Sequence, residues 1–146
     1  MQLIINYFVY QDHTLGTTSG KFLYVGKNLF QDSDKNARFR SPLLRDSSSS
    51  CQVDFWYKIK GKNIGSLEVY THVGAQKSRL LKLTSENEQW RKANAFIGRL
   101  RSSFHVSFET VNFTFTYGYI SIDDIDFISM LIIILYPNFM ILVINI

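Results

Sequence analysis

The chain has 146 residues, of which 46% are hydrophobic and 15% aromatic, and it carries a formal net charge of +4 at pH 7. This length suffices for one domain with a buried core, and the many Phe, Tyr and Val residues indicate a globular, sheet-rich protein. The basic excess is mild and contains no dense run of Lys and Arg, so the composition argues against nucleic-acid binding.

Residues 1–10 are apolar and uncharged, but they lack the cationic start and the small-residue cleavage site of a signal peptide. They are interpreted either as an edge strand or as a stub that lies outside the domain. Residues 11–20 are polar and rich in turn-forming residues, which predicts a loop.

Short extended segments follow one another through the rest of the chain. The predicted strands cover residues 21–26, 37–43, 51–60, 66–73, 78–84, 90–97, 103–110 and 117–128, and the predicted loops include 46–50 and 85–89. Pro42 ends the second strand because it has no amide hydrogen to donate to a sheet. About eight strands, with turn signals roughly every ten residues and no helical pattern, predict an all-β sandwich or barrel.

The clearest pattern covers residues 51–73. Apolar and polar side chains alternate at a period of two in residues 53–60, apart from Trp56, and the alternation resumes in residues 66–73. Gly61 and Gly65 bracket the segment between them, where glycine permits backbone angles that other residues resist. The sequence therefore predicts an antiparallel hairpin over residues 51–73.

The last predicted strand contains a break in its alternation. Ile120 and Ile122 fall on one face, whereas Ile125 and Phe127 fall on the other, so the phase changes at Asp123–Asp124. Two explanations remain open, namely a β-bulge or a carboxylate that points into the sandwich. A buried carboxylate would need a compensating cation. The candidate cations are Arg38, Arg40 and a bound metal.

Residues 129–146 carry no charge and, together with Phe127 and Ile128, approach the ~20 apolar residues that span a bilayer. Pro137 and Asn138 interrupt this segment, and no basic residue follows it to stop transfer. It is interpreted either as a membrane segment or as an apolar tail outside the domain, such as translated non-coding sequence. A glycolipid-anchor signal is disfavoured because no run of small residues precedes it.

An ordered set of motifs carries a family resemblance. The motifs are Asp12-His13-Thr14, residues 20–25 (GKFLYV), residues 37–43 (ARFRSPL), Cys51, Phe55-Trp56-Tyr57, Gly61, Gly65, Leu67, Val69-Tyr70, Trp90, residues 104–109 (FHVSFE) and residues 118–125 (GYISIDDI). Their order resembles that of the MAM domain, the extracellular module shared by meprins, neuropilins and certain receptor tyrosine phosphatases. The resemblance covers roughly residues 11–128, and it depends on the whole set because no single motif is specific.

The resemblance implies a jelly-roll sandwich of two antiparallel sheets over residues 11–128. It also implies a place outside the cell or at its surface, with membrane association through a parent protein or through the apolar tail. The implied function is adhesion or protein recognition without catalysis by the module itself. The implied partners are other cell-surface or extracellular proteins, including copies of the same chain.

Cys51 is the only cysteine, so the chain cannot form an internal disulfide. Taken alone, this fits a reducing compartment, a secreted module whose second cysteine is missing, or a small buried hydrophobe. The resemblance implies that the partner of Cys51 should follow shortly after residues 123–125, and that a cysteine pair should precede Asp12. Both are absent, so the chain is expected to be a truncated or mis-spliced member of the family.

Two kinds of modification or ligand site are predicted. Asp123 and Asp124 could bind Ca²⁺ together with Asp12 and backbone carbonyls, because calcium prefers several oxygen ligands. Some family members resemble this arrangement, and a salt bridge or a solvated bulge is the structural alternative. Asn112 begins an Asn-Phe-Thr sequon and predicts an N-glycan, provided that the chain enters the secretory path.

The remaining candidates for chemistry are given structural interpretations. The three histidines lack the spacing of zinc ligands, and no serine lies in a nucleophile elbow, so no catalytic residue is assigned. They are His13, His72 and His105. Trp56 and Trp90 are interpreted as core or inter-sheet packing, with a sugar-binding platform as the alternative.

A set of basic residues could meet acidic glycans if their loops converge. The set is Lys58, Lys60, Lys62, Arg99 and Arg101. The leading hypothesis is a non-enzymatic, MAM-like extracellular adhesion or recognition module. The alternatives are a glycan-binding jelly roll and an accessory domain of a larger membrane-bound ectoenzyme or receptor.

Overall fold

A computed structural model of the chain describes residues 2–3, 11–26, 36–61, 64–113, 118–132 and 141–143. These residues form ten β-strands and no helix. In chain order the strands are β1 (Gln2–Leu3), β2 (Leu23–Gly26), β3 (Arg38–Arg40), β4 (Arg45–Lys60), β5 (Ser66–Val73), β6 (Gln76–Leu83), β7 (Asn87–Phe96), β8 (His105–Val111), β9 (Tyr119–Ile132) and β10 (Ile141–Val143).

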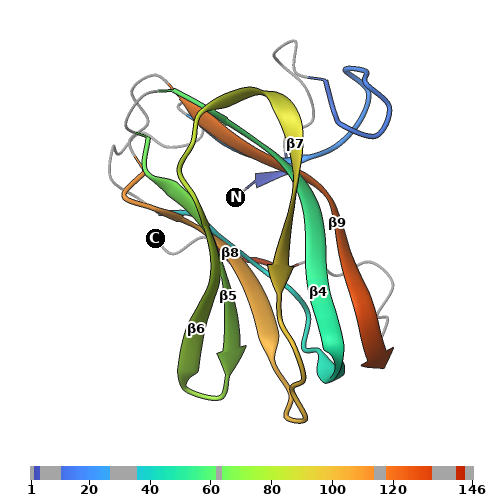
Figure 1. Cartoon of the computed structure of the whole chain (residues 1–146). Helices are drawn as coiled ribbons and strands as arrows, with labels where there is room; N and C mark the ends of the chain where they lie inside the picture. Colours follow the sequence, from blue (N-terminus) through green and yellow to red (C-terminus); the bar gives the residue numbers. More distant parts are fainter. Residues whose placement is uncertain are drawn as a thin grey trace.

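The strands form two antiparallel sheets that pack face to face (Figure 1). The first sheet has the order β1-β2-β9-β4-β7, and the second sheet has the order β10-β3-β8-β5-β6. From β2 to β9 the described chain changes sheet at every step except between β5 and β6. This connectivity is that of a jelly roll, so the predicted all-β jelly-roll sandwich is confirmed.

The core lies between the two sheets and is made by the inward side of each strand. Phe55 on β4 and Phe108 on β8 meet edge to face, with ring centroids 5.0 Å apart, and both are buried. Each such side chain contributes about 1.5–3 kcal/mol by leaving water. Other buried apolar residues include Leu23, Val25, Phe39, Val53, Ile59, Leu67, Val69, Val106, Ile120 and Ile122. The period of two in the sequence therefore identifies the core-facing side of each strand.

The predicted hairpin over residues 51–73 is wrong, although both of its strands exist. β4 pairs with β7 and β9, whereas β5 pairs with β6 and β8. Because both edges of each strand are occupied, β4 and β5 cannot pair, and they belong to different sheets. A hairpin turn lies later in the chain, at Gly74–Ala75, where Val73 pairs with Gln76.

Two predicted loops prove to be parts of strands. Residues 46–50 belong to β4, which pairs with β9 through Ser47 before an irregularity in the register. The buried Ser47 hydroxyl donates to Gly98 O at 2.7 Å and accepts from Leu100 N at 2.7 Å. β7 likewise begins inside the predicted turn over residues 85–89. The polar composition of both segments concealed their extended backbone.

The break in the alternation of the last strand is a β-bulge. Asp54 and Trp56 of β4 pair with Asp126 and Asp123 of β9, so β9 contains one extra residue across this interval. Asp124, with φ 48°, lies in the bulge. The extra residue shifts the phase of the alternation and returns the following apolar side chains of β9 to the core.

The alternative of a carboxylate inside the sandwich is therefore wrong. Asp123 pairs with Trp56 and lies with it on the outer face of the first sheet. Arg38 and Arg40, the cations expected to compensate it, lie on β3 in the second sheet.

Parts of both ends of the chain join the sheets. β1 pairs with β2, and β10 pairs with β3 at the edge of the second sheet. β9 runs on to Ile132, beyond the predicted domain boundary at residue 128. The rest of the predicted stub and tail, at residues 1, 4–10, 133–140 and 144–146, lies outside the described residues. Within the described parts of the chain there is no helix of the length and apolar character needed to cross a membrane.

The position of Gly65, directly before β5, predicts a sensitive glycine. Gly65 has φ 91°, and a Cβ atom there would overlap the carbonyl oxygens of Val111 and Asn112. We expect Gly65→Ala to lower the free energy of unfolding, measured by urea denaturation, by about 2 kcal/mol or more. Gly74→Ala is the matched control and should cost about 1 kcal/mol, because Gly74 has φ 56° and open space around it. Equal losses in the two variants would contradict this account of Gly65.

Candidate functional site

The loop of residues 11–20 is ordered by Asp12, whose side chain is buried at 3% exposure. Its carboxylate oxygens accept hydrogen bonds from Leu15 N at 2.9 Å and Thr17 N at 3.1 Å, and Asp12 N donates to Thr17 O at 3.1 Å. Such bonds from an aspartate to its own loop backbone are typical of turns. Asp12 therefore fixes the shape of the loop.

The two bulge carboxylates of β9 hold this loop against the outer face of the first sheet. His13 N donates to Asp123 Oδ2 at 2.9 Å, and the hydroxyl of Thr14 donates to Asp124. His13 Nδ1 lies 2.7 Å from Asp124 Oδ2, and the His13 ring stacks on Trp56 with centroids 3.6 Å apart. The loop and the bulge, which are far apart in the sequence, thus form one polar and aromatic cluster.

Both tryptophans lie on the outer face beneath or beside this loop. The indole N–H of Trp90 donates to Gln11 O at 3.1 Å, and the Phe22 ring meets Trp90 edge-on at 5.8 Å between centroids. Lys58 Nζ lies 4.9 Å from the centroid of the Trp90 ring. The prediction of core or inter-sheet packing is therefore wrong for Trp56 and Trp90. Their ring faces are engaged by the protein itself, which disfavours a sugar-binding platform.

The two bulge carboxylates differ in acidity. Burial raises the pKa of Asp123, and the negative charges of Asp124 and Asp12 act in the same direction, against hydrogen bonds from the backbone N–H groups of His13 and Asp124. The hydrogen bond from Thr14 lowers the pKa of Asp124, and the contact with His13 adds to this effect. The cluster therefore keeps Asp124 ionised and opposes ionisation of Asp123.

The structure gathers the three predicted metal ligands, Asp12, Asp123 and Asp124, around one loop. Their carboxylates already accept hydrogen bonds from the loop and the bulge backbone. Among the described side chains, no group of three or more His, Cys, Asp or Glu could hold a metal ion by itself. A cation here would also need backbone carbonyl oxygens, which calcium accepts as ligands.

The stacking of His13 predicts a local effect of its removal. We expect His13→Ala to speed hydrogen exchange of the Leu15 and Thr17 amides by about tenfold, because an aromatic stack and the side-chain hydrogen bond to Asp124 are together worth about 1 kcal/mol. His105→Ala, on the other sheet, should leave these two amides unchanged. Exchange that is unaffected in His13→Ala would show that the loop does not depend on the stack.

The outer face of the second sheet carries two buried carboxylates that the sequence analysis did not single out. Glu68 on β5 pairs with Glu109 on β8, and the two residues are 2% and 7% exposed. The alternation had placed both on the polar sides of their strands. It could not show that these sides would lie together, because that depends on which strands become neighbours.

Glu68 is compensated by cations and hydroxyls. Arg79 Nη1 lies 3.1 Å from its Oε2, Lys82 Nζ lies 3.5 Å from its Oε1, and the hydroxyls of Ser66 and Tyr70 donate to it. Burial raises the pKa of Glu68, but the hydrogen bonds from Tyr70, Ser66 and Arg79 outweigh this and lower it to about 2. Glu68 is therefore ionised at neutral pH despite its burial.

Glu109 has a second pair of cations. Arg38 Nε lies 2.9 Å from its Oε1, Lys77 Nζ lies 2.7 Å from its Oε2, and the Ser107 hydroxyl donates to Oε1 at 2.7 Å. Burial again raises the pKa, and the contacts with Lys77, Ser107 and Arg38 lower it below its ordinary value. Each buried carboxylate thus holds two basic side chains at the surface of the sheet.

The histidines do not form a catalytic arrangement with this network. His72 Nε2 lies 2.7 Å from Ser107 Oγ, but Ser107 is fully buried and gives its proton to Glu109. His72 Nε2 must then donate to Ser107, so it cannot act as the base that activates this serine. Burial also lowers the pKa of His72. His105 Nδ1 contacts Ser41 O at 3.0 Å, and His13 lies on the other sheet.

The acidity of Glu68 predicts loss of stability in acid. Because its folded pKa of about 2 lies below the ordinary value of 4.5, ionised Glu68 stabilises the fold above pH 4.5, and this contribution is lost as the pH falls towards 2. We expect Glu68→Gln to lower the free energy of unfolding at pH 7 by roughly 1–3 kcal/mol and to flatten its fall below pH 4.5.

Glu88→Gln is the control for this measurement. Glu88 is 74% exposed and lies 3.7 Å from Lys60 Nζ, so its replacement should leave the urea midpoint nearly unchanged at every pH. A Glu68→Gln variant with the same acid profile as the wild type would contradict the assignment.

Cys51 is buried and has a sulfur neighbour. Its Sγ lies 3.4 Å from Sδ of Met130, which is on β9 after the bulge. Burial raises the pKa of the Cys51 thiol, so it stays protonated and is a weak nucleophile. Met130 lies in the part of the chain where the family resemblance expects a cysteine, and its thioether packs against Cys51.

The contact predicts that position 130 can supply the missing bridge. We expect Met130→Cys to form a disulfide with Cys51 under oxidising conditions and to raise the free energy of unfolding by about 2–4 kcal/mol, lost again on reduction. Thiol titration and melting with and without reductant measure both effects. Ile128→Cys should keep two free thiols, because residue 128 pairs with Gln52 and is exposed. Two free thiols in oxidised Met130→Cys would show that the geometry is unsuitable.

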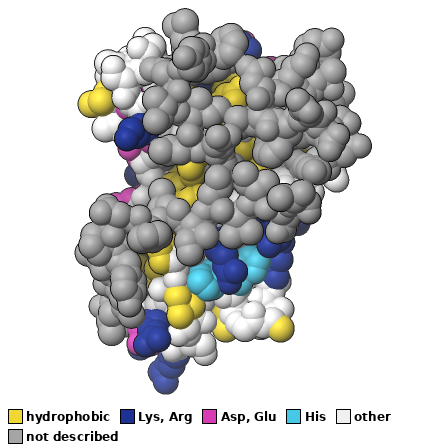
Figure 2. All heavy atoms as spheres, turned by 180° about the vertical axis from the view of Figure 1, so that it is seen from behind, with side chains coloured by type: hydrophobic (Ala, Val, Ile, Leu, Met, Phe, Trp, Pro, Cys, Tyr) yellow, Lys and Arg dark blue, Asp and Glu magenta, His cyan; other side chains and the backbone are white. Residues whose placement is uncertain are grey.

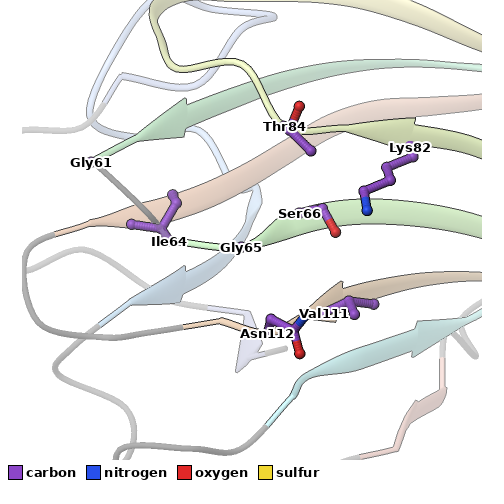
Figure 3. Close-up of a pocket in the computed structure, with 8 residues that line it drawn as sticks. All are labelled: Gly61, Ile64, Gly65, Ser66, Lys82, Thr84, Val111 and Asn112. Atoms are coloured by element: carbon purple, nitrogen blue, oxygen red, sulfur yellow. The ribbon is translucent and has the colours of Figure 1, made fainter.

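Asn112 is exposed at the end of β8, where its φ of 52° turns the chain out of the sheet. It contributes to a hollow of about 390 Å³ at the end of the sandwich (Figure 3). The other lining residues are Gly61, Ile64, Gly65, Ser66, Lys82, Thr84 and Val111. The position leaves the Asn112 side chain open to modification, while Thr114 of the sequon lies outside the described residues.

The basic set proposed for acidic glycans does not converge. Lys58 and Lys60 lie at one end of β4, whereas Arg99 and Arg101 flank Leu100, whose backbone N–H donates to Ser47 near the other end of β4. Lys62 lies outside the described residues. These residues therefore do not form one glycan-binding surface.

Comparison with known proteins identifies the family. The model of the MAM domain (meprin/A5/mu) matches residues 5–130, and the chain belongs to this family. Neuropilin-1a of Danio rerio is 29% identical over 119 residues, covering 78% of this chain and 13% of the relative. MAM domain-containing glycosylphosphatidylinositol anchor protein 1 of Gallus gallus is 28% identical over 114 residues, covering 75% of this chain and 12% of the relative.

The chain therefore spans about an eighth of the length of the curated relatives that it matches. Among solved structures, a carbohydrate binding module of family 29 overlaps with a TM-score of 0.43 at 11% identity, covering 84% of this chain and 70% of that one. This likeness is too weak to bear on the fold or the ligand of the chain.

Proposed function

We propose that this chain is an extracellular recognition module that binds other proteins and catalyses no reaction. The observation that carries the proposal is the match to the MAM family across residues 5–130. The geometry of the described residues agrees with it, because the serine in contact with His72 is buried and serves as a donor to Glu109. The polar side chains around His72 therefore stabilise the second sheet instead of activating a nucleophile.

We further propose that the module works as one part of a longer protein at the cell surface. The chain covers only 12–13% of its curated relatives, and one relative is named for a glycosylphosphatidylinositol anchor. In the secretory path, where N-glycans are added, the exposed Asn112 would be available for modification. Partners would be other cell-surface or extracellular proteins, or further copies of the chain. An accessory role beside a catalytic domain of a parent protein is the second candidate.

A bead assay tests protein recognition. The full chain, secreted from cultured cells, is coupled to beads and presented to a panel of cell types, with beads that carry the heat-unfolded chain as the control. We expect attachment to cells that protease treatment of those cells abolishes. Aggregation of the beads with one another would identify the chain itself as a partner. Attachment that never depends on cell-surface protein would overturn the proposal.

A glycosidase should lower the mass of the secreted wild type but not that of Asn112→Gln.

Calcium binding by Asp12, Asp123 and Asp124 remains a proposal for the loop cluster. Its support is the convergence of three carboxylates at one loop. Burial raises the pKa of Asp123, and repulsion from Asp124 and Asp12 acts in the same direction, a repulsion that a cation would relieve. We expect millimolar Ca²⁺ to raise the melting temperature of the wild type and to have no effect on Asp124→Asn. Mg²⁺ serves as the control ion. A melting temperature that ignores Ca²⁺ would leave the cluster with a purely structural role.

A further inference from the structure

The outer face of the second sheet is organised in cross-strand rows that run over β3, β8, β5 and β6. The first row is Arg38, Glu109, Glu68 and Lys82, the second is Arg40, Ser107, Tyr70 and Arg79, and His105, His72 and Lys77 follow in the third. We name these eleven residues the charged face. In each row a basic side chain lies on β6, and β3 contributes arginines to the first two rows. Figure 2 shows histidine side chains that adjoin Lys and Arg side chains on the side of the molecule seen from behind.

The charged face has an excess of positive charge. Five basic side chains surround two carboxylates, so the face carries a net charge of +3 with its histidines neutral. The two carboxylates are buried, whereas four of the five basic side chains reach the surface. The side chains of Arg79 and Lys82 are 52% and 48% exposed, and those of Lys77 and Arg38 are 38% and 35% exposed. A ligand would therefore meet cations first.

Arg40 adds a donor that the protein does not satisfy. Its Nε is buried and has no hydrogen-bond partner among the described residues. A buried guanidinium N–H without an acceptor is unfavourable, and an anion that reaches it would remove that cost. Arg40 lies in the same row as Arg79, and three strand spacings of about 4.8 Å separate them by roughly 14 Å.

The chemistry of the face favours a strongly acidic ligand over a neutral sugar. Tyr70 is its only aromatic side chain apart from the histidines, and Lys77 Nζ lies 4.0 Å from the centroid of its ring. The ring is thus already covered by a cation, and its hydroxyl is bonded to Glu68. Stacking of an uncharged sugar ring would have to displace Lys77, whereas a sulfate would be attracted by it.

The face also lacks the apolar centre that protein interfaces need. The large hydrophobic side chains exposed among the described residues are Leu15, Leu43, Phe96 and Ile128, and none belongs to the three rows. Protein recognition usually depends on a buried aromatic or aliphatic anchor, while polyanion binding depends on arrays of Lys and Arg. We propose that the charged face binds a sulfated polysaccharide. This site is distinct from protein recognition and does not depend on it.

Binding of the full-length chain to heparin, used as the sulfated probe, tests the proposal. The variant Arg40→Gln/Arg79→Gln removes two cations of one row and leaves Glu68 with Lys82, Ser66 and Tyr70. We expect about tenfold weaker binding, and a slope of log K against log salt that is smaller by about two. Arg99→Gln/Arg101→Gln is the matched control, because it makes the same change in net charge on the segment after β7. It should alter binding by less than about twofold.

A second variant guards against loss of folding. Lys77→Gln/Lys82→Gln leaves Arg38 on Glu109 and Arg79 on Glu68, and it should also weaken heparin binding while a cooperative melting transition is retained. The proposal is overturned if the control pair weakens binding as much as the face variants do. It is also overturned if desulfated heparin binds as tightly as heparin. Equal competition by an acidic peptide of matched charge would instead assign the face to an acidic protein partner.

Discussion

The pairing of β4 with β9 is the contact on which the rest of the domain depends. β9 lies between β2 and β4 in the first sheet, and β4 carries β7 on its other side. The bulge at Asp124 solves two problems within this pairing. It returns the apolar side chains of β9 to the core, and it presents two carboxylates on the outer face, where they accept hydrogen bonds from His13 and Thr14. One inserted residue therefore connects the interior of the sandwich to the loop that covers it.

The outer faces of the two sheets stabilise their buried carboxylates in different ways. On the first sheet, the loop supplies backbone and side-chain donors to Asp123 and Asp124, and the imidazole of His13 is the basic group that contacts them in the described part of the chain. On the second sheet, each buried glutamate is matched by two basic side chains that reach it from the flanking strands. The first arrangement fixes a loop, whereas the second leaves cations at the surface. Recognition of an acidic ligand is thus expected on the second sheet.

The sequence predicted the strands and the core residues far better than it predicted which strands pair with each other. Alternation identified the buried positions of β4, β5 and β8, and the phase change at Asp123–Asp124 located the bulge. The hairpin over residues 51–73 failed because a period of two is the same for strands that pair with each other and for strands that face each other across a core. The prediction of a loop over residues 46–50 was wrong for a different reason. These residues are rich in serine, and this composition is typical of loops, although the segment belongs to an irregular part of β4.

The candidate site was also predictable only in part, because the sequence pattern does not show which strands become neighbours. Asp12, Asp123 and Asp124 were connected through a family resemblance, and the structure does bring them to one loop. Trp56 was given to the core because its neighbours are apolar, but it occupies the polar phase of β4 and stacks on His13. Glu68 and Glu109 were missed because their meeting depends on the β5–β8 pairing. The local sequence of a strand does not indicate which other strand will pair with it.

The crossing connections of the jelly roll have a consequence for how the protein is made. During synthesis β2 and β4 emerge well before β9, which must later insert between them to complete the first sheet. Until then β4 has an unpaired edge and the core is open to water, so the nascent chain resembles an aggregation-prone intermediate. Completion of the first sheet must therefore wait for β9, and a ribosome that pauses before residue 119 would leave a chain that depends on chaperones.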